Sequence, residues 1–189
     1  MKELARSGHD PRWMDERRAR FERLFRDTYE VVLGYALRRA GPDLAQDVVA
    51  ETFTIAWRRL DDVPRDPVPW LLGVARRVLA NQRRGERRRD ALVERLSAPM
   101  PEPEPARDTR GSPALQALAL LPEHDRELLL LLAWEGLDAA AAAEVLGCSR
   151  PSLAVRLHRA RRRFAAALAD LERLPSTSPT AVQLPEGGH

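Results

Sequence analysis

The chain contains little cysteine, little aromatic side chain and almost no lysine. Cys148 is the single cysteine among 189 residues, which excludes an intrachain disulfide and a cysteine-based metal cluster. Aromatic residues make up only 5%, so the hydrophobic cores should consist mainly of Leu, Val and Ala. The four histidines lack metal-ligand spacing, and no nucleophile–base pair stands out, so we expect no cofactor, no metal and no enzymatic activity.

Long apolar runs are absent as well. No run approaches the length of a membrane span, and the N-terminal segment MKELARSGHDPRWM lacks the apolar core of a signal peptide. These absences predict a cytoplasmic protein without membrane insertion.

Positive charge is concentrated in two places. Lys2 is the sole lysine, so the cationic side chains are almost all arginine. Residues 76–89 hold seven Arg and one Glu, and residues 156–163 hold five Arg and no acid, while the net charge of the whole chain is only +3. Two clusters of positive charge in an otherwise acidic chain predict contact with an extended polyanion at two separate places.

The apolar spacing predicts an all-α fold with two small helical domains. No convincing alternation of β-branched residues occurs. After an N-terminal arm of residues 1–14, the first domain is expected over residues 15–97. Its first helix should end at Gly41-Pro42, a second should cover residues 43–60, and Trp70 should begin a third. Three prolines in six residues predict that segment 61–69 contains no helix.

A change of composition separates the two domains. Residues 98–113 are rich in proline, which predicts an extended linker. Residues 114–174 should form a second domain of four short helices, one of them built around the five leucines 128–132. The tail, residues 175–189, has the composition of a disordered segment.

The second domain carries the pattern of a helix-turn-helix. Residues 139–147 form a short helix with a terminal glycine, Cys148-Ser149 is the turn, and Pro151 fits only the first turn of the next helix. That helix has one apolar stripe, and its other faces carry arginines without any acid. Such a helix is suited to lie against phosphates, whereas an ordinary solvated helix normally mixes both signs of charge.

A second pattern lies on the expected helix 43–60. Four polar residues share one face: Asp47, Glu51, Thr54 and Arg58. Two carboxylates one turn apart are compatible with a metal or acid–base pair, but no His or third acid accompanies them. A protein-docking face for a basic partner fits better, because charges at the rim of an interface set register and association rate.

A third pattern lies on the helix that follows Trp70. Three arginines and one asparagine share one face of this helix, provided that it continues past Gly85: Arg77, Asn81, Arg84 and Arg88, with Arg76 beside them. Asn suits a base edge, and Arg mostly binds phosphate. The proline-rich segment 61–69 immediately before this helix is a candidate pocket for unstacked bases. Trp70 is either a core anchor or a stacking platform, and the former is the more common role.

Three segments in this order resemble one known family. AQDVVAETFTIAW (residues 45–57) is similar to the core-polymerase-binding segment of bacterial sigma factors, with Phe53 and Trp57 beside the two acids. Residues 69–89 are similar to the segment that reads the −10 element, and residues 121–164 to the domain that reads the −35 element. With only these two domains, the match is to the extracytoplasmic-function (ECF) class of the sigma-70 family.

The resemblance implies a subunit that binds RNA polymerase core and promoter DNA, in the bacterial cytoplasm at the nucleoid. An anti-sigma factor is a further candidate partner, and the sequence leaves open whether one exists. The same resemblance implies that Asp47, Glu51, Thr54 and Arg58 bind polymerase, and that the arginines and Asn81 of residues 76–88 bind −10 DNA. The linker acids Glu102, Glu104 and Asp108 would follow the RNA path of the polymerase. The expected −35 contacts are Arg150, Ser152, Ala154, Val155, Arg156, Arg159 and Arg163.

The chain departs from the family pattern at several positions. The usual Glu-Ile-Ala of the first helix-turn-helix helix is replaced by Ala141-Ala142-Ala143, which removes the Glu of a capping box although Asp138 remains a possible cap. A free-standing helix-turn-helix regulator, usually dimeric, stays open as the alternative, although no heptad seam for a dimer is visible outside the expected cores.

Overall fold

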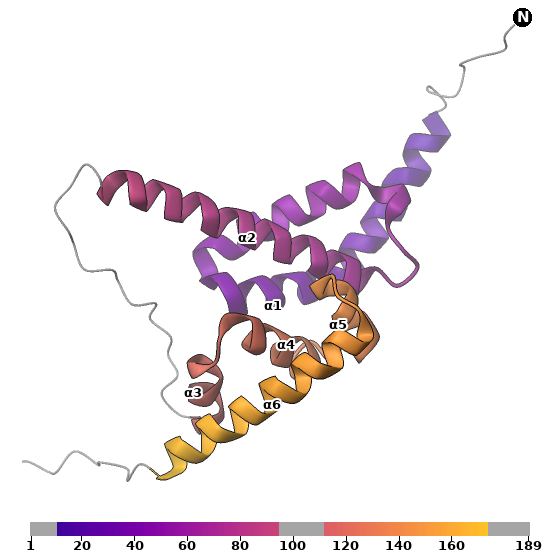
Figure 1. Ribbon diagram of the computed structural model, residues 1–189. Helices are drawn as coiled ribbons and strands as arrows, with labels where there is room; N and C mark the ends of the chain where they lie inside the picture. Colours follow the sequence, from indigo (N-terminus) through magenta and orange to yellow (C-terminus); the bar gives the residue numbers. More distant parts are fainter. Residues whose placement is uncertain (1–10, 95–111, 174–189) are drawn as a thin grey trace, which may run out of the picture.

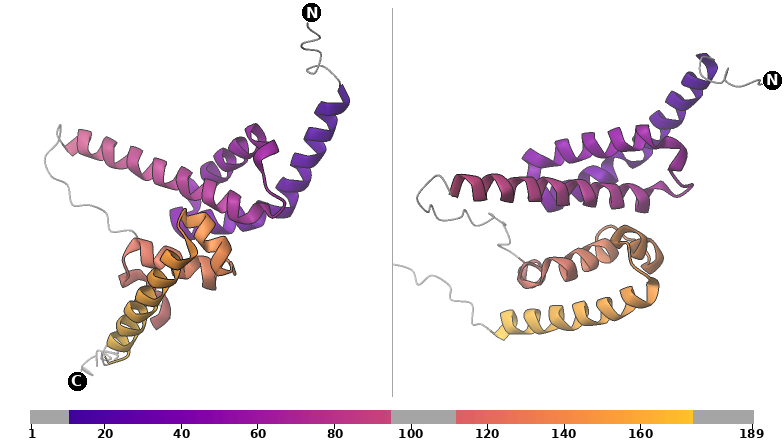
Figure 2. Two further views of the ribbon diagram at one scale, coloured as in Figure 1. Left: turned by 45° about the vertical axis from the view of Figure 1, so that its right-hand side comes forward. Right: turned by 45° about the horizontal axis from the view of Figure 1, so that its top comes forward.

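The computed structural model describes residues 11–94 and 112–173. These residues form six α-helices and one short 3₁₀ helix, with no strand among them. The helices are grouped in two layers, one of α1 and α2 and the other of α3 to α6 (Figures 1 and 2). The expected all-α fold is confirmed.

Helix α1 covers Pro11–Arg58 and has a sharp kink in its middle. Gly41 has a φ of 75° and a ψ of 175°, which interrupts the helix directly before Pro42. Left-handed φ values are accessible to glycine at little cost, and Pro42 has no N–H to donate. The expected break at Gly41-Pro42 is therefore confirmed. The helix begins at Pro11, however, four residues before the expected start of the first domain.

The expectation of a helix-free segment over residues 61–69 is wrong in part. A 3₁₀ helix covers Leu60–Asp62, and α2 covers Pro67–Glu94, so α2 begins before Trp70. Pro67 and Pro69 lie in the first turn of α2, where backbone N–H groups need no intrahelical acceptor and proline therefore costs little. Only residues 63–66 are non-helical. At its other end α2 continues past Gly85, as the alignment of its arginines requires.

The core of the first domain lies between the two halves of α1 and the start of α2. Tyr35, Val48, Leu71 and Leu72 are fully buried there. Trp70 is half-buried, packs against this core and has the guanidinium of Arg59 over its ring, consistent with a core anchor. Phe25 of α1 lies at the edge of this core and is 40% exposed.

The second domain consists of the four expected helices. They are α3 (Pro113–Leu120), α4 (Glu123–Ala133), α5 (Ala139–Leu146) and α6 (Arg150–Arg173). At 24 residues α6 is a long helix rather than a short one. Leu128 and Leu131 are buried and the other leucines of the run are half-buried, so this run does form a core helix.

The two domains share one continuous hydrophobic core. The buried cluster includes Leu71 and Leu72 of α2 together with Ala142 and Val145 of α5. At Gly73 the backbones of the two domains come close together: a β-carbon placed on it would lie 3.8 Å from Val145 Cα. The N-terminal end of α1 projects away from this contact (Figure 1).

Three sequence-based expectations lie outside the described residues. They are the disordered tail, most of the N-terminal arm and nearly all of the proline-rich linker with its acids Glu102, Glu104 and Asp108.

Candidate nucleic-acid and polymerase interfaces

Helix α6 presents a cationic outer face. Its apolar stripe points inward, with Leu153 and Ala160 buried and Leu157 and Phe164 half-buried. No acid occurs in α6 before Asp170. Five exposed arginines have no hydrogen bond or ion pair to any described residue: Arg150, Arg156, Arg159, Arg161 and Arg162. Val155 lies on the same helix as these arginines; it is 53% exposed and is the one large apolar side chain that α6 exposes.

The turn before α6 has the geometry that the sequence predicts. Asp138 caps α5 by accepting a 2.8 Å hydrogen bond from the Ala141 N–H. Gly147 ends α5 in the left-handed region, with a φ of 63°, and the Cys148 N–H donates to the Ala143 carbonyl at 3.0 Å. Ser149 Oγ accepts from the Ser152 N–H at 3.4 Å at the start of α6. These local bonds set α6 against α5 as a helix-turn-helix.

Arg163 differs from the other arginines of α6. Its Nη1 lies 2.5 Å from Oδ2 of Asp125, a carboxylate that is almost fully buried in the first turn of α4. About half of the Arg163 side chain remains exposed. An intramolecular partner already neutralises much of its charge, so Arg163 is less available to phosphate than Arg159.

Helix α2 carries the other cationic face. Asn81, Arg77, Arg84 and Arg88 are all exposed along its outer side. Arg84 Nη2 donates to Asn81 Oδ1, and Arg88 Nε donates to the Arg84 carbonyl at 3.2 Å. These contacts connect Asn81, Arg84 and Arg88 along one polar row. Arg76 is exposed as well.

The segment before α2 is anchored to the N-terminal half of α1. Arg17 Nη1 lies 2.8 Å from Asp61 Oδ2, and Arg17 Nη2 donates to the Trp57 carbonyl at 2.8 Å. Arg59 Nε donates to Asp62 Oδ2 at 2.9 Å. Asp61 and Asp62 therefore both have partners, and the Val63 carbonyl accepts from Arg20 Nη2 at 3.4 Å.

An acidic row lies on the second half of α1. All four side chains predicted to share this face are exposed there: Asp47, Glu51, Thr54 and Arg58. Neither Asp47 nor Glu51 makes a hydrogen bond or ion pair with a described residue. Asp43, one turn before Asp47, is also exposed and extends the row; its i−4 spacing was a signal that the sequence reasoning missed. Among the described residues, no group of three His, Cys, Asp or Glu is placed to hold a metal.

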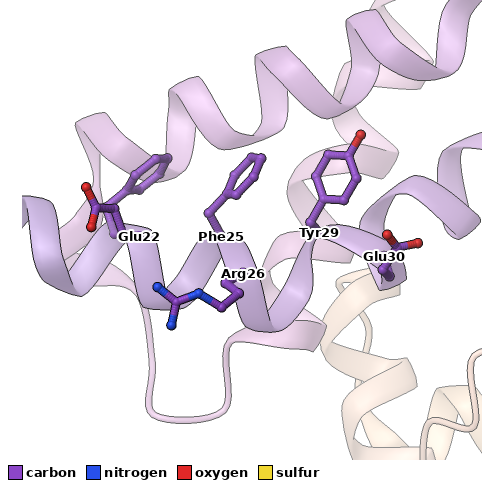
Figure 3. A pocket seen from close by; sticks show the side chains of 6 residues that line it. Glu22, Phe25, Arg26, Tyr29 and Glu30 are labelled. Carbon is purple, nitrogen blue, oxygen red and sulfur yellow. The ribbon is translucent and has the colours of Figure 1, made fainter.

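The first half of α1 forms a groove that the sequence analysis did not assign to any site. Its volume is about 610 Å³, and its lining includes Phe21, Phe25 and Tyr29, at intervals of one helical turn. Figure 3 shows the rings of Phe25 and Tyr29 side by side on one face of the helix. Phe25 also contacts Phe53, with ring centroids 4.7 Å apart. The sequence signal for this groove is the i, i+4, i+8 spacing of its three aromatic residues.

Every predicted site residue is exposed. The structure places them in three rows, one on the second half of α1, one on α2 and one on α6. Two acid-poor cationic helices, one of them in a helix-turn-helix, define a nucleic-acid-binding protein of two α-helical domains. No helix of the described residues is long and apolar enough to cross a membrane.

The comparisons with known proteins agree with this class. Residues 24–89 match the family model "Sigma-70 region 2", and residues 113–164 match "Sigma-70, region 4". The chain is 29% identical over 156 residues to the ECF RNA polymerase sigma factor SigL of Mycobacterium tuberculosis. This alignment covers 78% of this chain and 88% of SigL. The chain is 29% identical over 163 residues to the RNA polymerase sigma factor NccH of Alcaligenes xylosoxydans xylosoxydans, covering 74% and 88%. A probable RNA polymerase sigma factor RfaY of Xanthomonas campestris pv. campestris is 32% identical over 128 residues, 62% of this chain and only 32% of that longer protein.

Solved structures share the fold. CnrH, in complex with the cytosolic domain of CnrY, has a TM-score of 0.55 and 28% identity, covering 79% of this chain and 88% of that one. The sigma factor RpoE of Bartonella quintana, in complex with the anti-sigma factor NepR, has a TM-score of 0.60 at 22% identity, covering 79% and 96%. The chain belongs to the sigma-70 family of RNA polymerase sigma factors, in the ECF class. Its function is accordingly promoter-specific initiation of transcription through binding of RNA polymerase core and promoter DNA.

Proposed function

We propose that the two domains divide promoter recognition between them. Helix α2 and residues 63–66 read the −10 element, and the N-terminal part of α6 reads the −35 element. The observation that carries this division is the presence of two exposed cationic helix faces, one on each domain. A dimeric helix-turn-helix regulator would need only one of these faces, and the family models match both domains.

Within α6 we assign different tasks to different residues. Recognition helices present their N-terminal residues to base edges and use their flanks to hold the backbone. We assign base contacts to Arg150, Ser152, Ala154 and Val155, and phosphate contacts to Arg156, Arg159 and Arg163. Arg150 is suited to a bidentate contact with guanine, and the exposed Val155 to the methyl group of thymine.

We propose that the acidic row on α1 docks on the polymerase. Asp47 and Glu51 are exposed without a partner among the described residues, so both charges are available to a basic surface. We extend this docking surface to the groove of Phe21, Phe25 and Tyr29. Phe25 packs on Phe53, only two residues beyond Glu51, and partly exposed aromatic rings are enriched at the centres of protein interfaces.

These roles need no catalytic group and no cofactor. We propose that the chain acts as a binding subunit without chemistry of its own, in the bacterial cytoplasm at the nucleoid. An anti-sigma factor is a proposed further partner, because the CnrH and RpoE structures above each contain a second protein.

The docking role is tested by the double variant Asp47→Ala with Glu51→Ala. We expect binding to core polymerase to weaken by about 1–4 kcal/mol, the range for interfacial charge pairs, while circular dichroism shows an unchanged fold. The matched control is Glu144→Ala with Glu172→Ala, two exposed acids of the second domain whose loss changes the net charge equally. Co-elution with core polymerase as tight as that of the control would refute the docking role.

A further inference from the structure

Arg17, on the N-terminal half of α1, connects parts of the first domain that are far apart in the sequence. Its two contacts are with Oδ2 of Asp61, in the 3₁₀ helix, and with the carbonyl of Trp57, in the last turn of α1. These partners follow Arg17 by 44 and 40 residues along the chain. One guanidinium therefore bridges the end of α1 and the segment that leads into α2.

The surroundings of Arg17 hold its guanidinium in place. The side chain is only 15% exposed. Its guanidinium carbon lies 5.7 Å from the ring centroid of Trp13 and 5.3 Å from that of Trp57, within the range of cation–π attraction. The Trp57 carbonyl belongs to the last turn of α1, where carbonyls have no intrahelical donor. A planar guanidinium with several fixed donors can satisfy this carbonyl and the Asp61 carboxylate together, which a lysine ammonium on a flexible stem does less well.

Arg20, on the same face of α1, adds a weaker connection to the same segment. Its Nη2 donates to the Val63 carbonyl at 3.4 Å, and its Nη1 lies 3.8 Å from Asp61 Oδ1. Val63 is buried, whereas the next three residues, 64–66, are all exposed. The base of the segment is therefore tied to α1 while its tip faces solvent.

The segment's remaining contacts give it less directional support. Its backbone bonds are local: the Asp62 N–H donates to the Arg59 carbonyl at 2.9 Å, and the Val63 N–H to the Leu60 carbonyl at 3.3 Å. Leu60 and Val63 are buried, but apolar packing is not directional. Charge-assisted hydrogen bonds are directional and stronger than neutral ones, so Arg17 is suited to fix the orientation of the segment on α1.

Two other roles fit Arg17 less well. The Asp61 side chain is 80% exposed, and an ion pair with a solvated partner adds little stability. A direct phosphate contact is disfavoured because the Arg17 side chain is mostly covered and both of its Nη atoms already have acceptors within the chain.

We propose that Arg17 is a positioning residue for −10 recognition: it holds residues 60–63 on α1 so that the tip, residues 64–66, meets the bases of the −10 element in one orientation. This inference rests on the proposed assignment of residues 63–66 to the −10 element. Specific contacts require that the contacting groups be held to within about 0.5 Å by the residues behind them. Loss of Arg17 should therefore reduce discrimination between −10 sequences more than it reduces the affinity for promoter DNA in general.

The test compares Arg17→Ala with Arg18→Ala in the full-length chain bound to core polymerase. Arg18 is exposed, has no hydrogen bond or ion pair to a described residue, and its loss changes the net charge equally. Transcription is measured from promoters with single substitutions in the −10 or the −35 element. Arg17→Ala should lower the ratio between preferred and substituted −10 sequences by about tenfold, the equivalent of one base-specific contact. The −35 ratio and co-elution with polymerase should stay unchanged, and Arg18→Ala should change neither ratio.

Two further measurements separate positioning from the other roles. Loss of a phosphate contact would lower the slope of log Kobs against log salt by about 0.7–0.9, whereas loss of positioning leaves the slope unchanged. Hydrogen exchange of the free full-length chain should be faster over residues 60–66 in Arg17→Ala and not in Arg18→Ala. This second measurement needs neither polymerase nor DNA.

The partner residue provides a second variant. Asp61→Ala removes a mostly exposed side chain, so the fold should survive. It should lower the −10 ratio by less than Arg17→Ala does, because Arg17 keeps the Trp57 carbonyl. The double variant should lower the ratio no further than Arg17→Ala alone, as expected for two residues that act through one contact.

Several results would overturn the proposal. An unchanged −10 ratio in Arg17→Ala, or an equal fall of the −10 and −35 ratios, would show that Arg17 does not position the segment. A lower salt slope at an unchanged −10 ratio would make Arg17 a phosphate contact. Unchanged hydrogen exchange over residues 60–66 would show that the segment does not depend on Arg17. Where circular dichroism shows that Arg17→Ala is misfolded, Asp61→Ala replaces it, and an unchanged −10 ratio in that variant counts against the proposal.

The exchange of residues 63–66 for those of another such factor separates this inference from the proposed function. If that exchange leaves −10 preference unchanged, the assignment of the segment to the −10 element is wrong and the inference fails with it. If the exchange alters −10 preference and Arg17→Ala does not, the positioning role alone is refuted.

Discussion

The pairing of Arg163 with Asp125 leads to a prediction that separates two arginines of the same helix. Arg159 is exposed and unpaired among the described residues, whereas Arg163 Nη1 lies 2.5 Å from a nearly buried carboxylate. If Arg159 binds a phosphate, Arg159→Ala should reduce the slope of log Kobs against log salt by about 0.9, the value for one phosphate contact on duplex DNA. The free energy of unfolding should stay almost unchanged.

Arg163→Ala should behave differently. Its charge is partly neutralised by Asp125, so the slope should fall by clearly less than one unit. The carboxylate of Asp125 loses its ion pair with Arg163 and, among the described residues, keeps the contact with His124, whose Nε2 lies 3.3 Å from Oδ1. A buried polar group left without a partner costs about 1–3 kcal/mol; because half of Arg163 is exposed, we expect about 1–2 kcal/mol of lost stability. Asp125→Asn should have the opposite effect on binding, because it frees Arg163 for phosphate and steepens the slope.

The assay compares salt titrations of promoter binding by polymerase that carries each variant, so that contacts of the polymerase itself cancel in the difference. Urea unfolding of the free chain gives the stability. If Arg163→Ala lowers the slope as much as Arg159→Ala and leaves the unfolding midpoint unchanged, the ion pair does not form in solution and the reasoning fails.

Four shorter predictions concern other residues. Arg150→Ala should reduce the preference for guanine at one −35 position by about 1–3 kcal/mol, and Val155→Ala should abolish the discrimination between thymine and deoxyuridine at another. An equal loss of affinity for every sequence in a panel of −35 duplexes would instead make both residues nonspecific contacts. Exchange of residues 63–66, or Asn81→Ala, should alter −10 preference in promoter profiling and leave −35 preference unchanged, and a joint shift of both elements would contradict the division between domains. Thr52→Val should raise the free energy of unfolding by about 1 kcal/mol in urea titrations, because Thr52 Oγ1 is buried with no hydrogen-bond partner among the described residues. Burial, and then the neighbouring Glu127, raises the pKa of Tyr35 far above its ordinary value of 10, while Arg39 and Arg76 oppose the shift. The Tyr35 contribution to stability should therefore be fully present below pH 10 and be lost as the pH rises above it. Unfolding measured from pH 8 to pH 11 should show a smaller loss of stability in Tyr35→Phe than in the unmodified chain.

Much of this protein follows from local sequence patterns. The break at Gly41-Pro42, the cap at Asp138 and the left-handed Gly147 depend on the backbone preferences of a few adjacent residues, so they could be located without a structure. The exposed rows on α1, α2 and α6 follow from helical periodicity for the same reason. The expectation of no helix at residues 67–69 was wrong because the effect of proline depends on its position: proline breaks a helix interior and is tolerated in the first turn.

Other features were decided only by tertiary structure. Phe25 belongs to an apolar stripe, but its exposure depends on where Phe53 and the second half of α1 lie. Asp125 and Arg163 are 38 residues apart, and Tyr35 and Glu127 are 92 apart, so no local pattern connects them. Periodicity shows which face of a helix is apolar or charged; it cannot show which distant segment packs on that face. The sequence by itself therefore determined the helices and their charged rows, whereas the pairing of Arg163 with Asp125 and the polar contacts between the two domains depend on segments far apart in the chain.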